Sequence, residues 1–463
     1  MSTTINAAAA RAAGPRRELG LASAVAAVAG EAIAVGIFLT PAGMAKALGS
    51  PFWLLVVWLA VGAMTVCGAL CYGELGGRFP RDGGTYVYLH ETFGRGAAFL
   101  YGWMCMLVLD PGVTASLAVG IALYAAYILH WPAQVTKIVG IGLIWVFCLS
   151  NIFSVKVSAG VLRWMTWLKL GVLTLLTLWA FVFRLGAWSN FIPFVAQRTG
   201  SLPLIPALGA GLVAAFYSFG GWWDVSKLAG EVREPARTLP RALVLGVLAV
   251  TAIYVLVSAA FWYLVPLEKV TSDEAFVAQV GDVLFGAAGG TAFALIVIVC
   301  MLGSLAALVI SAPRVYFAMA EDGLFLPAFA RIHPRFGTPA RAVIIQGVTA
   351  SLLVLMGTFQ QIIAYFVFVA VVFLALAVSA VFFLRRRALG DRNVILTPGY
   401  PFTPLAFLLL VALLLVLVAA HSPREALLGS TVVLAGLPVY LLFRRNLPDV
   451  QAGQSVSQGA MNG

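Results

Sequence analysis

Two apolar segments of this sequence are interrupted by glycine, and each interruption would free backbone groups that can bind a solute. The first segment is residues 30–41, with Gly36 near its centre, and the second is residues 216–224, with Gly220 and Gly221. A helix that unwinds at membrane depth leaves N–H and C=O groups without partners, and hydrocarbon cannot satisfy them. We therefore expect both segments to face one polar cavity.

The ends of the half-helices predict how a zwitterion would bind there. A helix N-terminus carries about half a positive charge and bare N–H groups, so a carboxylate fits against residues 35–37. Carbonyl groups freed near residues 217–219 suit an ammonium group, and an α-amino acid carries both ends. The alternative is that Gly36 and the Gly220–Gly221 pair only allow helices to pack closely. The predicted substrate-binding residues are Ala34, Val35, Gly36, Ile37, Tyr217, Ser218, Phe219, Gly220, Gly221 and Asp224.

Polar side chains inside apolar segments supply a second set of candidates, because ionisable residues are costly in a membrane and are functional by default. Lys169 lies in such a segment, and the alternative for it is extension of the ammonium group to the membrane surface. Each of Glu31, Asp110 and Asp224 could hold a substrate amine, carry a proton or pair with a basic neighbour. Asp224 is the best candidate for binding a cationic side chain of the substrate. The predicted coupling or gating residues are Lys169, Glu31, Asp110 and Ser304.

The elements that position these residues are membrane-spanning helices. Apolar residues make up 62% of the chain and charged residues 10%, against about 25% charged residues in soluble domains. A span needs roughly 20 apolar residues, which predicts an all-α membrane protein with about twelve transmembrane helices, and Pro111 is expected to kink the third of them. The predicted spans are 20–47, 52–75, 96–128, 135–151, 159–184, 203–229, 240–265, 286–318, 341–357, 360–384, 402–420 and 426–443.

The positive charge of the chain indicates orientation rather than an anionic partner. The net charge is +11, and 23 of the 29 Lys and Arg residues fall on one side of the predicted spans. Loops rich in Lys and Arg stay in the cytoplasm. We therefore expect a multi-pass protein of a bacterial inner or plasma membrane with both termini in the cytoplasm, the lipid bilayer as its surroundings, and no nucleic acid partner.

The two interruptions occupy corresponding places in two halves of the chain. We predict a cytoplasmic tail at 1–19, a first five-helix repeat at 20–184, a second at 203–385, helices 11 and 12 at 402–443, and a disordered cytoplasmic tail at 448–463. An odd number of spans in each repeat gives the halves inverted topology, and paired interrupted helices are the best sequence indication of a transporter's binding site.

Several motifs together resemble the amino acid–polyamine–organocation (APC) superfamily, and most closely the bacterial relatives of L-type amino acid transporters. Each motif alone is weak, but the set extends from residue 30 to residue 341. The motifs are Gly36-Ile37-Phe38 with Pro41, Tyr72-Gly73-Glu74-Leu75 with Pro80, Gly83-Gly84, Tyr86 and Tyr88, Phe93-Gly94, Gly102-Trp103, Glu231-Val232 with Pro235, Arg237 and Leu239-Pro240-Arg241, and Ser311, Arg314, Asp322-Gly323 and Pro327.

The resemblance implies a LeuT-like fold of 5+5 inverted repeats with broken helices 1 and 6, and secondary active transport of amino acids by alternating access. It further implies that Phe219 closes over the substrate and that Lys169 occupies the place that sodium takes in sodium-coupled relatives. The protein is then a sodium-independent exchanger or proton symporter. Related eukaryotic transporters bond to a heavy chain through a cysteine between helices 3 and 4. Residues 130–134 contain no cysteine, so no disulfide-linked heavy chain is expected.

Other functions stay open on the sequence. The chain has Ala34 where the family has Gly, and Trp223 where an acidic or amide residue is usual, with Asp224 one place later. A polyamine or small-amine transporter is therefore an alternative, as is an amino acid sensor that binds without transport. No Cys-x-x-Cys pair or His/Cys cluster suggests a metal or cofactor, and no nucleophile–base set suggests an enzyme. Oligomeric state is not indicated.

Overall fold

The computed structural model describes residues 17, 19–33, 36–153, 159–270, 276–387 and 394–444, and all of its secondary-structure elements are helices. Ala34 and Val35, residues 448–463 and most of 1–19 lie outside the described residues. Within the described part, the only β-type pairing is an isolated bridge between Leu19 and Val232.

Ten helices of the described residues are long and apolar enough to cross a membrane, fewer than the twelve expected. The two remaining predicted spans, 159–184 and 341–357, are helical, but their apolar parts are shorter than those of the ten candidates. The first is α10 (Ala159–Val182), whose apolar part is Trp167–Val182, and the second is α16 (Ala340–Met356). The ten candidates are Leu21–Leu39, Pro51–Arg78, Arg95–Leu129, Ala133–Ile152, Leu204–Glu231, Pro235–Leu264, Ala287–Phe317, Phe359–Arg387, Phe402–His421 and Pro423–Leu442.

Both glycine interruptions break their helices. The segment predicted as one span at 20–47 consists of α2 (Leu21–Ala32), α3 (Gly36–Leu39) and α4 (Pro41–Leu48). The second consists of α11 (Leu204–Phe219), a turn, and the 3-10 helix η3 (Asp224–Glu231). Gly221 in that turn has φ +93°, a conformation that glycine adopts readily and other residues rarely do.

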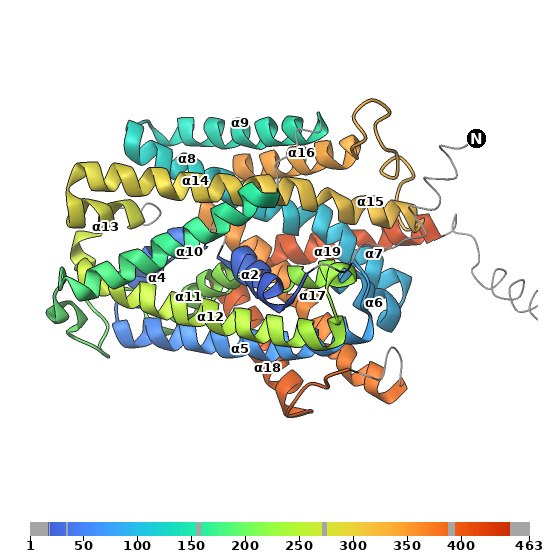
Figure 1. Cartoon of the computed structure of the whole chain (residues 1–463), viewed down its shortest axis with the longest axis horizontal. Coiled ribbons are helices and arrows are strands. Elements are labelled where there is room, and N and C mark those ends of the chain that lie inside the picture. The colour runs from blue at the N-terminus through green and yellow to red at the C-terminus, as the bar shows by residue number, and fades with distance from the viewer. Residues whose placement is uncertain are drawn as a thin grey trace, which may run out of the picture.

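The long helices pack in two groups around these interrupted helices (Figure 1). Along one edge, α5 (Pro51–Arg78) packs on α12 (Pro235–Leu264), and α2 packs on α12. Along the opposite edge, α8 (Asp110–Leu129) packs on α14 (Ala287–Ser311), on α16 and on α9 (Ala133–Ile152). The remaining long helices are α17 (Phe359–Arg387), α18 (Phe402–His421) and α19 (Pro423–Arg444).

Several irregular or short helices depart from the predicted spans. The third predicted span is divided into α7 (Arg95–Met104), a π-helical turn at Cys105–Leu109, and α8. This turn lies just before Pro111, which lacks the N–H needed for a regular ladder, so the expected distortion is present. Three short helices were not predicted because they are too short to span: α6 (Thr85–Phe93), α13 (Phe276–Phe285) and α15 (Pro313–Glu321). The predicted span 286–318 accordingly divides into α14 and α15.

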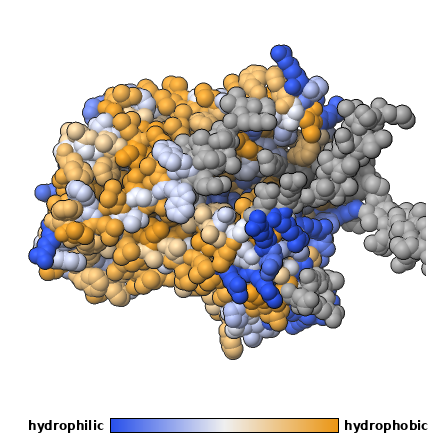
Figure 2. Space-filling model, viewed as in Figure 1, coloured by the Kyte–Doolittle hydropathy of each residue, from blue (hydrophilic) through white to orange (hydrophobic). Residues whose placement is uncertain are grey.

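The molecular surface fits a lipid environment. Figure 2 shows hydrophobic side chains over most of one face, with hydrophilic side chains gathered towards the two ends of the helices. Large apolar side chains such as Ile205, Leu409 and Leu434 are well exposed. Lipid tails, rather than water, are the solvent that such a surface favours.

A buried carboxylate ties α5 to the second half of the chain. Glu74 has no exposed surface and accepts hydrogen bonds from Arg78, from Arg385 on α17, and from the backbone and hydroxyl of Thr397. Its ion-pair distances are 2.9 Å to Arg78 and 2.6 Å to Arg385. Glu74 is therefore a structural residue that pairs with two guanidinium groups. The cluster fixes one end of α5, whose other contacts include α11 and α12.

Candidate functional site

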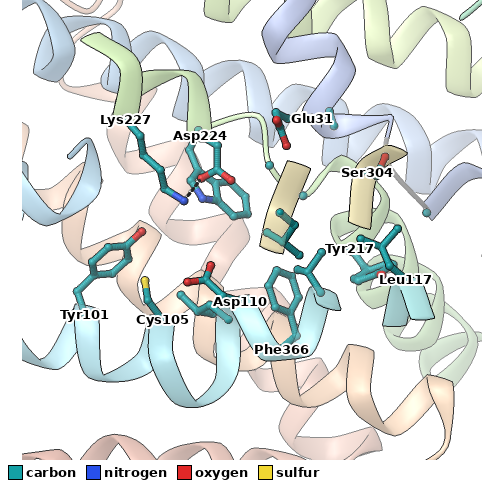
Figure 3. Close-up of a pocket in the computed structure, with 18 residues that line it drawn as sticks. Glu31, Tyr101, Cys105, Asp110, Leu117, Tyr217, Asp224, Lys227, Ser304 and Phe366 are labelled. Carbon is teal, nitrogen blue, oxygen red and sulfur yellow. Dashed lines mark ion pairs between the residues drawn. The ribbon is translucent and has the colours of Figure 1, made fainter. Parts of the chain in front are cut away.

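A central cavity opens between the two interruptions. Its free volume is about 70 Å³, room for about five ordered waters. The first interruption contributes Glu31, Ala32 and Gly36, and the second contributes Tyr217, Gly220, Gly221, Trp223 and Asp224. The other walls come from Tyr101, Cys105, Leu109, Asp110, Val113, Leu117, Lys227, Ser304, Leu308 and Phe366 (Figure 3).

The two interruptions touch directly, and Gly36 makes this contact possible. A Cβ atom built on Gly36 would lie 2.2 Å from the Cα of Ser218. Beside this contact, the hydroxyl oxygens of Thr40 and Ser218 are 2.8 Å apart. Gly36 therefore serves close packing as well as lining the cavity, so the two interpretations of this glycine are compatible.

Tyr254, on α12, lies against the freed carbonyls of both interruptions. Its hydroxyl oxygen is 2.9 Å from the carbonyl oxygen of Ala32 and 2.6 Å from that of Ser218, and its single proton can go to either. The side chain is fully buried. Sequence reasoning missed this residue, although a tyrosine inside an apolar span indicates a buried hydrogen-bond partner.

Lys169 and Ser304 lie beside the first interruption. The Lys169 ammonium donates to the Gly30 carbonyl at 3.1 Å and to the Ser304 hydroxyl at 3.2 Å, and the side chain is 4% exposed. The ammonium therefore lies inside the protein and does not extend to the membrane surface. Its bonds join α2, α10 and α14, and Ser304 also lines the cavity.

Three of the predicted residues lie behind the cavity wall. Phe219 is buried against the rings of Trp58 and Tyr254, with ring centroids 6.1 and 5.1 Å apart. Ser218 bonds to Thr40, and Ile37 is fully buried. In this conformation Phe219 therefore packs in the core. Tyr217 instead lines the cavity, where its hydroxyl contacts that of Ser116.

Acidic and basic side chains meet on the opposite wall. Asp110 begins α8, is 7% exposed, and accepts a hydrogen bond from the Tyr316 hydroxyl at 2.8 Å. Asp224 pairs with Lys227 at 2.8 Å across one turn of η3. Figure 3 shows the Lys227 ammonium directed at Asp224 and into the space above Asp110. Sequence reasoning missed Lys227 as a site residue, because it counted this lysine only among those that set topology.

A larger hollow of about 630 Å³, here called the vestibule, lies at the end of the molecule that carries α6 and α15. Lys227 lines both the vestibule and the central cavity. The other vestibule residues are Arg81, Asp82, Gly83, Tyr86, Val87, His90, Arg95, Leu228, Glu231, Ser311, Val315, Asp322 and Leu324.

Polar contacts join the loops around the vestibule. Tyr86 donates to Asp322 at 2.8 Å, which links α6 to the turn after α15. Burial raises the pKa of the Tyr86 hydroxyl, and the Asp322 carboxylate raises it further, so the tyrosine stays a donor at neutral pH. Asp82 accepts from the Gly230 N–H at 2.9 Å, and the Gly83 N–H donates to the Lys227 carbonyl at 3.2 Å. These bonds hold η3 against the loop at 79–84.

The cavity chemistry suits a small polar solute. No group of three or more His, Cys, Asp or Glu side chains that could hold a metal occurs in the part of the chain that the structure describes. The cavity combines freed backbone groups with carboxylates, an ammonium and tyrosine hydroxyls. Such an arrangement can bind and orient a charged molecule, mainly through hydrogen bonds and ion pairs.

Comparisons with known proteins agree with this geometry. The sequence model of a family described as "Amino acid permease" matches residues 19–443. The chain is 30% identical to the "Serine/threonine exchanger SteT" of Bacillus subtilis, over 92% of this chain and 97% of that protein. It is 27% identical to "b(0,+)-type amino acid transporter 1" of Mus musculus (92% and 88%) and 26% identical to the "Cystine/glutamate transporter" of Homo sapiens (92% and 85%).

Proposed function

The chain belongs to the amino acid permease family, and from that premise we propose that it moves amino acids across the membrane by alternating access, as a sodium-independent exchanger or proton symporter. The relatives are named as transporters and exchangers of amino acids, and none of those named is an enzyme. The chain is a multi-pass membrane protein, with at least the ten candidate spans of its described residues.

The observation that carries the proposal is that both interruptions open onto the same cavity. Gly36, Tyr217 and Gly220 line it from the two sides. In the proposed binding mode, N–H groups at Gly36 bind the substrate carboxylate, and carbonyls of the second interruption, near residues 217–220, bind its ammonium group. The predicted contacts of Ala34 and Val35 belong to the same arrangement but lie outside the described residues.

The twelve-helix 5+5 arrangement is part of the proposal. Helices α10 and α16 bring the ten candidate spans to twelve, and the interrupted helices begin the first and second repeats. The excess of Lys and Arg supports placing the vestibule on the cytoplasmic side of the inner membrane, together with both termini. The structure then represents a conformation whose larger hollow faces the cytoplasm.

Sodium independence is supported by Lys169. Its ammonium donates to the Gly30 carbonyl, next to the first interruption. A fixed cation at this place supplies the positive charge that a bound sodium ion would otherwise bring to a freed carbonyl. Movement of a proton on or off Lys169, Glu31 or Asp110 would give the symport form of the mechanism.

A second candidate function, transport of a small amine, is favoured by the carboxylates of the cavity. Glu31, Asp110 and Asp224 all line it, and an amine without a carboxylate could bind to them alone. Competition distinguishes the two functions. An amine substrate should be displaced by putrescine and not by alanine, whereas an amino acid substrate should be displaced by other amino acids of its class.

The test is counterflow in proteoliposomes of the purified protein. Vesicles loaded with an unlabelled amino acid should accumulate the labelled amino acid, whereas empty vesicles and vesicles without protein should not. Binding measured by thermal shift without any flux would indicate a sensor, and it would contradict the proposed transport.

A further inference from the structure

The half of the central cavity that is formed by Asp110, Asp224 and Lys227, here called the inner half, carries charges that do not balance. Asp110 and Asp224 contribute two carboxyl groups to this half, and Lys227 contributes one ammonium group. At the first interruption, Glu31 adds a third carboxyl group to the cavity, and the Lys169 ammonium donates to the neighbouring Gly30 carbonyl. An uncompensated charge in a protein interior is expensive, so the inner half of the cavity favours one further positive charge.

Lys227 stands between this charged wall and the vestibule. Lys227 lines both hollows. The side chains of Lys227 and Asp224 are each 24% exposed. The backbone of Lys227 is held separately, because its carbonyl accepts the Gly83 N–H at 3.2 Å. The side chain can therefore turn away from Asp224 while η3 stays in place. Figure 3 shows it occupying the space between Asp224 and the row of Tyr101, Cys105 and Asp110.

From these positions, and resting on the proposed function, we propose that the substrate is a basic amino acid and that Lys227 is a tethered cation holding the place of the substrate's side-chain cation. The ammonium or guanidinium group of the substrate replaces Lys227 at Asp224. Lys227 then turns into the vestibule, where Glu231 and Asp322 supply carboxylates.

The size of the cavity agrees with this exchange. A free volume of about 70 Å³ holds about five waters, which is too little for a whole basic amino acid beside Lys227. When the Lys227 side chain withdraws, the volume that it occupied becomes available to the substrate. Leaving Asp224 unpaired is unfavourable, so Lys227 leaves only when another cation takes its place. Substrate charge is thereby coupled to opening the path to the vestibule.

The experiment compares arginine with citrulline, its neutral isostere, in thermal-shift binding and in counterflow with the full-length protein. Arginine should bind at least about tenfold more tightly than citrulline and should drive exchange. Lys227→Met removes the competing charge at nearly constant length and should tighten arginine binding, while Asp224→Asn should abolish the preference for arginine. Arg237→Gln is the matched control, since Arg237 forms an exposed i,i+3 pair with Glu234, and it should leave the preference unchanged.

Equal binding of arginine and citrulline by the wild type would overturn the inference, and so would weaker arginine binding by Lys227→Met. If Lys227→Met does not yield folded protein, Lys227→Arg provides the test: it keeps the charge and should keep the preference. Exchange of serine or alanine without preference for arginine would remove the inference and leave the proposed function standing. Absence of binding and flux with all classes of amino acid would overturn both.

Discussion

Gly36 faces Ser218 so closely that a methyl group on the glycine would lie 2.2 Å from the Cα atom of the serine. The two residues belong to different interruptions, which are joined beside this contact by the hydrogen bond between Thr40 and Ser218, 178 positions apart in the chain. Gly36 also lines the central cavity. A change in the shape of the cavity therefore either moves both interruptions as a unit or breaks the contact between Gly36 and Ser218.

We predict that Gly36→Ala reduces counterflow at least about tenfold, because the added methyl group meets backbone rather than a flexible side chain and pushes the interruptions apart. Gly142→Ala is the control, since its Cβ would meet nothing within 4 Å, and it should leave the rate unchanged. Initial rates in proteoliposomes measure both. A Gly36→Ala protein with the wild-type rate would show that the contact is not needed.

Tyr254→Phe should lower stability by about 1–3 kcal/mol, because it leaves a buried carbonyl without a donor, and it should also weaken amino acid binding. The hydroxyl lies against the carbonyls of Ala32 and Ser218. Tyr127→Phe is the control, because Tyr127 donates to Asp282, away from both interruptions. Thermal melting with and without substrate separates the two effects. The role of Tyr254 at the site would be excluded if both variants lost stability but bound amino acid normally.

Replacing sodium by choline should leave counterflow unchanged, whereas Lys169→Ala should abolish it by removing the cation from the Gly30 carbonyl. Lys137→Ala serves as the control, because this lysine is exposed and donates to the Leu355 carbonyl at 3.3 Å. Tracer uptake in both salts checks the prediction. A wild-type requirement for sodium would contradict the role assigned to Lys169.

Glu74→Gln should destabilise the protein by about 3–5 kcal/mol, since it leaves the guanidinium groups of Arg78 and Arg385 without their carboxylate. Glu91→Gln removes a partly exposed pair with Arg81 and should change stability by less than about 1 kcal/mol. Chemical unfolding in detergent measures both variants. Equal effects of the two substitutions would mean that the buried cluster does not stabilise the end of α5.

The sequence predicted the positions of both interruptions because glycine and proline act locally on the backbone. It also predicted the helical class, since apolar composition is independent of tertiary contacts. The features that the sequence did not predict depend on tertiary packing. Phe219 lies in an interruption but packs on Trp58, and α13 is too short for an apolar-length criterion. Lys227 became a site candidate only when the structure placed it between two hollows.

The most direct test is the structure of the protein with its exchanged amino acid bound. We predict that the α-carboxylate lies about 3 Å from backbone N–H groups at Gly36, with the α-ammonium group facing the carbonyls near Gly220. An amino acid bound only in the vestibule, with the space between the two interruptions unfilled, would contradict the account.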